Sequence, residues 1–510
     1  MSKNNLRLRY SGLIIFTTQL LGVVTGLIFT LLLTRSTSPD EFGTWTNIFD
    51  YTPYFIILSG VLPFWITRYT ARDKEGAIVT GALGQLFIAT IATLIYLPSI
   101  YFISNAIGTS QYILIYFIAG FYVFTTYLIG VFEAALTAIK PHAAGYGFII
   151  QEIVKVAVAL IVILGFKQVF LGAILALVIA PAIQTIYYVI LLRGRFKEHV
   201  SWGYLKQWLK GSPVLLYNVA GGQLLSFVFI LLYFYGGSEA RAYYQAALSF
   251  TTIVGYASSL AVSLYPKLLA NTCSEKEVGV SLRTVMMLAI PLATLVMVMA
   301  VSFLTILNIA YSVAWPVLII LTVDTLILAL NTFYSAVMMG TEAFDTAGEI
   351  HLKELIKSRI FKLFSIPYLQ AFIAVPVTYF LLTQLPVDGP VTADVAIVAV
   401  LVLVHLCTFI GIATMTRRTI HVPIAWKSIA KYVSAATIMG IVLYLIPTTT
   451  TLMATISKTL AGFGLYIVIV LAIDETAREL IRLIWKEIID TLKQLTLKNS
   501  GRKHSNITEN

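Results

Sequence analysis

Charged side chains are scarce in this chain of 510 residues. Asp, Glu, Lys and Arg make up only 12% of it, whereas hydrophobic residues make up 58% and the mean hydropathy is +0.87. A soluble domain of this size carries many more charged residues on its surface. The composition therefore excludes a soluble protein and predicts an all-α, polytopic membrane protein.

Cysteine is nearly absent, and the common catalytic motifs are missing. Cys273 and Cys407 have no metal-ligand spacing and support no disulfide framework. The chain has no Walker sequence, no HExxH motif and no nucleophile–base pair. It also lacks the large external loop expected of a membrane glycosyltransferase and the re-entrant filter segment of an ion channel. We therefore expect a protein that is not an enzyme and needs no cofactor or metal. Without a basic soluble face, no nucleic-acid partner is expected.

Long apolar segments dominate what is present, and each is long enough to cross a bilayer as a helix. They predict about fourteen transmembrane helices: 11–34, 47–66, 77–104, 111–137, 145–165, 168–192, 212–235, 241–265, 284–308, 313–340, 366–385, 392–415, 432–449 and 456–474. The first six and the next six predict two pseudo-symmetric six-helix lobes, followed by two extra helices. The expected domains are 1–210 with a cytoplasmic linker, 211–415, the extra helices in 416–475, and an amphipathic tail in 476–510.

The distribution of basic residues predicts the orientation. With a cytoplasmic N-terminus, 30 of the 35 Lys and Arg residues fall in segments on the cytoplasmic side. This bias follows the positive-inside rule, and it also accounts for the net charge of +11. We therefore expect a multi-pass protein of the cell membrane with both termini in the cytoplasm.

Three segments on the predicted cytoplasmic side are amphipathic. The patches begin at Trp202, at Leu352 and at Leu480, and in each of them apolar residues recur among polar or basic ones. We expect these segments to lie in the membrane interface. Binding of anionic lipid headgroups is the alternative.

Polar side chains inside the predicted spans are candidates for function, because a charge at the bilayer centre is costly and usually faces an interior. These residues are Gln19, Glu133, Gln151, Glu152, Lys155, Asn218, Gln223, Asp324, Asn331, Ser335 and His405. Lys155 is the only basic residue placed within a span, about a third of the way along its helix from the cytoplasmic side. Glu152 shares its helix face.

Each of these candidates also has a purely structural interpretation. Glu152 and Lys155 can simply neutralise each other, and Glu133 can extend to the nearby membrane surface. Asp324 can be protonated or hydrogen-bonded to a neighbouring helix. His405 can be a packing residue, and Gln19 and Asn218 can form hydrogen bonds between helices.

A short motif recurs at the join between the first two helices of each proposed half. The first copy, Arg35-Ser-Thr-Ser-Pro39-Asp-Glu41-Phe-Gly43, is matched by a second that begins at Glu239 and ends in Tyr243-Tyr-Gln-Ala-Ala. The second copy has Arg241 where Gly43 stands, so the two turns are not expected to have the same role. These motifs, together with the fourteen-span layout, resemble Wzx-type polysaccharide flippases. That family belongs to the multidrug/oligosaccharidyl-lipid/polysaccharide exporter superfamily.

The resemblance implies two lobes around a central cavity and transport by alternating access. The implied cargo is an oligosaccharide on a polyprenyl (pyro)phosphate, moved from the inner to the outer leaflet for polysaccharide or glycoprotein assembly. Membrane lipids and glycan polymerases or glycosyltransferases are the other partners considered. Two alternatives stay open: cation-coupled export of small amphipathic compounds, and a non-transporting subunit of a glycan assembly complex.

The site hypotheses follow from this implied cargo. Lys155 is expected to hold the phosphate, with Glu152 balancing its charge in the empty state. Arg35 and Arg241 are expected exit-side contacts, and Gln19 and Asn218 complete the substrate set. Asp324, Glu133 and His405 are candidates for coupling to an ion gradient.

Overall fold

The computed structural model describes residues 3–258, 275–341, 358–384, 388–475, 477–479 and 482, although not the side chains of residues 3–17, 19, 20 and 214. Regular structure in these residues is helical throughout. The first half contains α1 (Lys3–Ser36), α2 (Pro39–Phe55), α3 (Val61–Ala71), α4 (Ala77–Ile107), α5 (Ile113–Ile139), α6 (Pro141–Ala159) and α7 (Val169–Leu192). The short helix α8 (Trp202–Gly211) follows.

The second half and the C-terminal pair continue in the same manner. The helices are α9 (Pro213–Leu231), α10 (Ser238–Gly255), α13 (Glu275–Val298), α14 (Ala300–Leu307), α15 (Trp315–Gly340), α17 (Arg359–Gln384), α18 (Pro390–Arg417), α19 (Trp426–Leu445) and α20 (Leu452–Ile473). Within the described residues, eleven helical segments are long and apolar enough to cross a membrane. The prediction of an all-α, polytopic membrane protein is therefore confirmed.

The prediction of a single helix over 47–66 is wrong. The chain forms α2, leaves the helical conformation after Phe55, and starts α3 at Val61. Pro53 removes a backbone donor near the end of α2, and Gly60 stands at the start of α3. Two more of the fourteen predicted spans are not among the eleven helical segments, namely 11–34 and 241–265. They coincide with α1 and α10, and each extends into residues or side chains that are not described.

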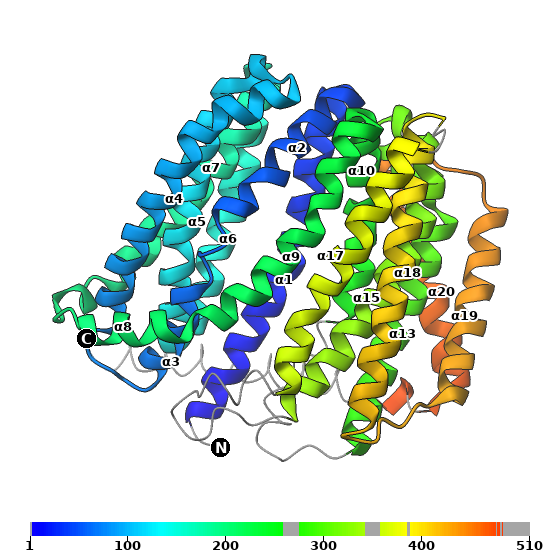
Figure 1. Ribbon diagram of the computed structural model, residues 1–510. Helices are drawn as coiled ribbons and strands as arrows, with labels where there is room; N and C mark the ends of the chain where they lie inside the picture. Colours follow the sequence, from blue (N-terminus) through cyan, green and yellow to red (C-terminus); the bar gives the residue numbers. More distant parts are fainter. Residues whose placement is uncertain are drawn as a thin grey trace, which may run out of the picture.

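Two groups of helices lean together at one end of the molecule and diverge toward the other (Figure 1). In the N-terminal lobe, α1 packs on α6, and α5 packs on α3, α4 and α7. In the C-terminal lobe, α15 packs on α18 and α17 packs on α9. The two lobes meet mainly where α2 packs against α10 and α9. The domain boundaries expected from the sequence remain predictions.

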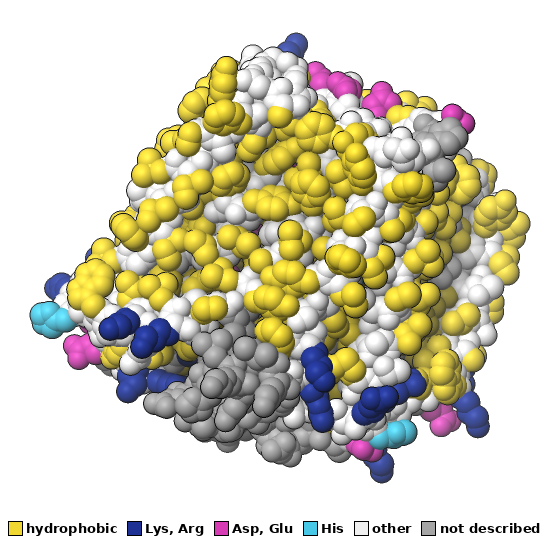
Figure 2. All heavy atoms as spheres, in the orientation of Figure 1, with side chains coloured by type: hydrophobic (Ala, Val, Ile, Leu, Met, Phe, Trp, Pro, Cys, Tyr) yellow, Lys and Arg dark blue, Asp and Glu magenta, His cyan; other side chains and the backbone are white. Residues whose placement is uncertain are grey.

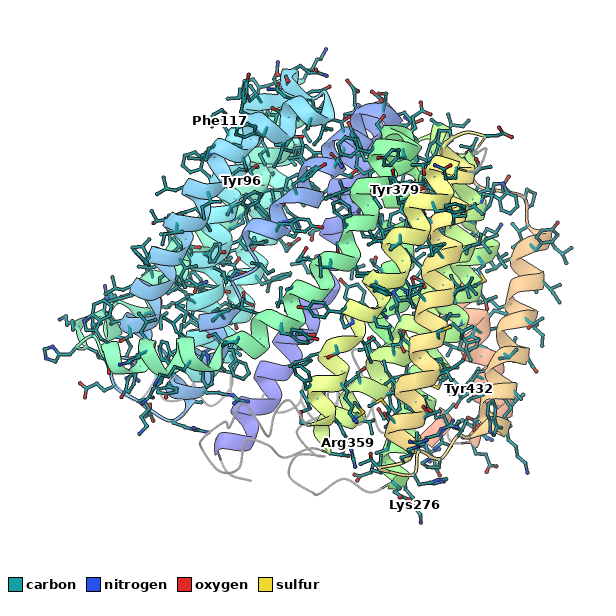
Figure 3. The ribbon with its side chains drawn as sticks, viewed as in Figure 1. Tyr96, Phe117, Lys276, Arg359, Tyr379 and Tyr432 are labelled. Atoms are coloured by element: carbon teal, nitrogen blue, oxygen red, sulfur yellow. The ribbon has the colours of Figure 1, made fainter. Side chains whose placement is uncertain are left out.

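The surface divides into an apolar middle and two polar ends. Hydrophobic side chains cover the middle of the visible face (Figure 2). Most of the Lys and Arg side chains gather at its lower end, whereas Asp and Glu side chains lie at both ends. The side chains of Phe372 and Tyr444 are 80% and 81% exposed, as suits contact with lipid. Lys276 and Arg359 lie at the lower end, whereas Tyr379 lies near the upper end (Figure 3). The positive-inside rule predicts that the lower end is the cytoplasmic side and the upper end the outer side.

The first of the three expected amphipathic segments forms the helix α8, and its location in the membrane interface remains a prediction. It lies across the lower end of the N-terminal lobe (Figure 1). Trp208 is fully buried, with its ring 5.3 Å from that of Tyr69, whereas Trp202 is 66% exposed. Gly211 adjoins Trp65, and the Ser212 hydroxyl donates to the Trp208 carbonyl at 2.6 Å. Most of the second amphipathic segment and nearly all of the third lie outside the described residues.

Candidate functional site

Glu152 and Lys155 form a buried ion pair on α6. The Lys155 Nζ donates to both carboxylate oxygens of Glu152, at 2.8 and 2.6 Å. Thr25 of α1 donates its hydroxyl to the same carboxylate. The side chains of Glu152 and Lys155 are 4% and 13% exposed, so most of the pair is shielded from solvent. The ion pair expected from their three-residue spacing is present, and α1 contributes a third polar group.

Lys155 lies farther along its helix than the first third in which we expected it. The helix starts at Pro141 and continues through a π-helical turn to Gly165. Lys155 is thus about 21 Å from the start of the helix, at 1.5 Å per residue. The placement in the first third is wrong, since Lys155 already stands at the midpoint of the predicted span 145–165 and lies just past the middle of the observed helix.

Arg35 fastens the outer end of α1 to α14. Its Nε and Nη2 both donate to the carbonyl of Ile306, at 2.9 and 2.7 Å. Asn308 donates to the carbonyl of Thr34 at 3.4 Å. Carbonyls in the last turn of a helix have no intrahelical partner, so Arg35 satisfies one of these groups in α14. Arg35 is exposed, but two of its donors are already used.

The recurring motif places two helix starts against each other. Ser38 and Glu41 form a reciprocal capping box at the start of α2. Gly43 faces the start of α10 so closely that a Cβ atom would lie 1.8 Å from the carbonyl oxygen of Ser238. The Ser238 hydroxyl also donates to Asp40. The two copies thus contact each other across the lobes, and only glycine fits at position 43.

Arg241 forms an ion pair across the same contact. Its Nε and Nη2 donate to the two carboxylate oxygens of Asp50 on α2, both at 2.7 Å. Its Nη1 donates to Gln245 at 3.2 Å, and the guanidinium carbon lies 5.3 Å from the ring centroid of Phe229. Arg241 and Asp50 side chains are 6% and 9% exposed. The arginine that departs from the first motif therefore locks the lobes together.

Asp394 is a third buried charge-bearing residue beside this contact. It lies in the first turns of α18 and is 0% exposed. Among the residues that the structure describes, no side chain donates to either carboxylate oxygen. Its polar neighbours are the guanidinium of Arg241 and the backbone N–H of Tyr244.

Sequence reasoning missed both Asp50 and Asp394. Each lies inside a predicted span, and a carboxylate in a span is a signal that could have found them.

Asp324 and His405, expected as separate candidates, form one pair between α15 and α18. The His405 Nδ1 lies 2.7 Å from Asp324 Oδ1, and their side chains are 7% and 3% exposed. Asn331 donates to the backbone carbonyl of His405 at 3.4 Å. Glu133 lies elsewhere, with an exposed side chain on α5 of the other lobe.

The remaining candidates are not part of these clusters. Asn218 is half-buried on α9, and Gln19 lies on α1, where its side chain is outside the described residues.

Removing one member of the Asp324–His405 pair is expected to destabilise the protein. Asp324→Ala leaves a buried imidazole without its partner, at a cost of about 3–5 kcal/mol. Asp324→Leu combined with His405→Leu should recover most of this loss, because apolar residues can replace a buried pair. Thermal unfolding of the purified protein in detergent measures the effect. A midpoint for Asp324→Ala equal to that of the wild type would contradict it.

An apolar pocket of about 320 Å³ lies between the lobes and the C-terminal pair. Its walls come from α1, α10, α13, α14 and α20. The lining side chains include Leu31, Phe250, Val296, Ile456 and Phe463. A second pocket of about 510 Å³ lies between α2, α4 and α9 and includes Tyr51 and Phe227. Neither pocket could be located from the sequence, since their walls come from helices distant in the chain.

Comparisons with solved structures identify the fold. An inward-facing MATE family multidrug resistance transporter of the MOP superfamily has a TM-score of 0.62 and 12% identity, covering 78% of this chain and 95% of its own. The lipid II flippase MurJ, in an inward closed conformation, has a TM-score of 0.61 and 14% identity, covering 92% of this chain and 99% of its own.

A MOP superfamily transporter from Pyrococcus furiosus, described as having a binding pocket of reverse polarity, has a TM-score of 0.52 and 13% identity, covering 81% of this chain and 96% of its own. No family model and no curated protein matches the sequence. The chain therefore has the fold of MOP superfamily transporters.

Proposed function

We propose that this protein is a flippase of the cell membrane with both termini in the cytoplasm. It moves a polyprenyl-(pyro)phosphate-linked oligosaccharide from the inner to the outer leaflet by alternating access, for cell-surface polysaccharide or glycoprotein assembly. The observation that carries the proposal is the apolar pocket between α1, α13 and α20. A lipid-linked sugar needs an apolar path for its chain beside a polar path for its headgroup, because sugars do not cross hydrocarbon unaided.

The C-terminal helices support this cargo over a small amphipathic compound. α20 forms one wall of the pocket, and α19 packs against α20 and α13. The flippase MurJ aligns with 92% of this chain, whereas the inward-facing MATE transporter aligns with 78%. The additional helices α19 and α20 would thus help to bind a lipid chain. Export of a small compound does not require such a binding site.

The polar path is assigned to α1 and α6. Lys155 binds the phosphate, and Glu152 holds its ammonium while the site is empty. Gln19 and Asn218 complete the substrate contacts. Arg35 and Arg241 contact the cargo on the exit side only after their present partners, the Ile306 carbonyl and Asp50, have moved away. Asp324 and His405 couple the cycle to an ion gradient, and Glu133 is the further candidate for this role.

The proposal is tested with the purified full-length protein in liposomes that contain a fluorescent oligosaccharide diphosphate polyprenol. We expect the labelled headgroup to become accessible to a membrane-impermeant quencher faster than in empty liposomes. Ile456→Trp fills the pocket and should slow this movement severalfold. Val468→Trp, at a 65% exposed position of α20 outside the pocket, is the matched control.

Two outcomes would contradict the proposed cargo. Transport of a cationic dye without movement of the lipid-linked sugar would identify an exporter of small compounds. Movement of neither substrate by a well-folded protein would identify a non-transporting subunit.

A further inference from the structure

Arg241 lies near two carboxylates. One belongs to the N-terminal lobe, and the other belongs to the same C-terminal lobe as Arg241. In this structure Arg241 is saturated by Asp50 of α2, with two bonds of 2.7 Å. Asp394, on α18 of its own lobe, is fully buried and has Arg241 as its charged neighbour. One guanidinium thus stands between two carboxylates, only one of which it binds.

Asp394 has no ionic partner of its own in this state. An ionised carboxylate at 0% exposure, to which no described side chain donates a hydrogen bond, pays a large desolvation cost. The guanidinium nearby already neutralises Asp50, so little of its charge remains for a second anion. A proton is therefore the ligand that suits Asp394.

We propose that Asp394 is a proton-binding site that controls the contact between the lobes. With its proton bound, Arg241 pairs with Asp50 and the outer ends of α2 and α10 stay together. When the proton leaves to water on the outer side, Asp394 becomes the ionic partner of Arg241, and Asp50 is released with its lobe. The proposal rests on alternating access as part of the proposed function, but it does not depend on the cargo.

Separation of the lobes makes the exchange necessary. Outward opening must pull α2 away from α10, since these helices form the main contact between the lobes. A buried guanidinium that loses Asp50 needs another anion, because an unpaired charge is costly in a membrane protein. Asp394 moves with Arg241, since α10 and α18 pack together within the C-terminal lobe. The exchange therefore keeps one ionic partner on Arg241 in both states.

Of the ionisable groups around Asp394, we expect Asp394 itself to gain and lose the proton when the contact between α2 and α10 changes. α10 contributes Glu239, Arg241, Tyr243 and Tyr244. α15 contributes Asp324, α2 contributes Asp50, and α18 itself contributes His405. Asp324 and His405 already bind each other.

The helix α17 and the turn Leu232–Gly236 also pack on α18. The turn and the nearby end of α17 contribute the tyrosines Tyr233, Tyr235 and Tyr379. The charged residues of α17, Arg359 and Lys362, lie toward its cytoplasmic end, and Figure 3 shows Arg359 far from the upper end that contains Tyr379.

The experiment measures the separation of the outer ends by electron–electron resonance between nitroxides. The labels replace Gln111, beside α5, and Gln384, at the end of α17, in the otherwise cysteine-free full-length protein in lipid nanodiscs. We expect the population with the longer distance to grow as pH rises, since loss of a proton favours opening. Asp394→Asn should keep the short distance at every pH. Asp388→Asn, an exposed carboxylate just before α18, should behave like the wild type.

A second variant tests the other half of the exchange. Asp50→Asn removes the charged partner across the lobes, so the longer distance should dominate even at low pH. A pH response that persists in Asp394→Asn, or that is absent from the wild type, would overturn the proposal. So would a short distance in a folded Asp50→Asn protein. The distance measurement is made without cargo. If it gives the expected pH response but the flipping assay fails, the result counts against the proposed cargo alone.

Discussion

Gly43→Ala is expected to keep the lobes from closing at the outer side and to abolish most transport. The new Cβ would lie 1.8 Å from the carbonyl oxygen of Ser238, whereas real contacts of Cβ atoms stay beyond about 3 Å. Overpacking costs about 1–3 kcal/mol, so the ratio of closed to open protein should fall by roughly 5- to 150-fold. The outer-end distances and the liposome flipping assay described above measure both consequences.

Gly60→Ala is the control for this prediction. Gly60 lies at the start of α3 with nothing within 4 Å of its Cβ position, and its φ of −84° suits any residue. Alanine should be tolerated there, and both proteins should be produced at similar levels. Equal transport by the two alanine variants would show that the backbones of α2 and α10 do not need to meet.

Replacing Lys155 is expected to have two separable effects. Lys155→Gln leaves Glu152 buried without a counter-charge, which should cost about 3–5 kcal/mol and lower the amount of folded protein. Glu152→Gln with Lys155→Gln removes both charges and should restore the protein level. This double variant should still flip lipid-linked sugar at least about tenfold more slowly, because a charge-assisted hydrogen bond contributes about 1.5–3 kcal/mol.

The comparison requires variants matched for charge and for production. Lys206→Gln, at an exposed position of α8, removes one positive charge away from the pair and should flip normally. The protein amount in each liposome preparation is measured by quantitative immunoblotting. Normal flipping by the double variant would show that the ion pair serves folding alone.

The helical class and the Glu152–Lys155 pair could be predicted because both depend on local patterns. Apolar length determines a membrane span, and a three-residue spacing places two side chains on one helix face. The break between α2 and α3 was missed because hydropathy does not register the backbone donor that Pro53 removes.

The pairing of Arg241 with Asp50 could not be predicted, since the two residues are 191 positions apart and their contact depends on how the lobes meet. The same applies to Asp324 and His405, which are 81 positions apart. Each was visible as a polar residue in a span, but sequence position alone does not determine its partner. Asp394 required the structure for a further reason, because what distinguishes it is that it is fully buried and no described side chain donates to it.

The position of α8 determines where the two lobes can pivot. The chain passes from the N-terminal to the C-terminal lobe once, through residues 193–212. Trp208 anchors α8 to α3, and Ser212 is bonded back to Trp208, so this part of the linker moves as one body with the N-terminal lobe. The covalent hinge is thereby confined to the start of α9, beside Pro213. A swing of the C-terminal lobe about this point leaves α8 stationary at the lower end of the N-terminal lobe (Figure 1).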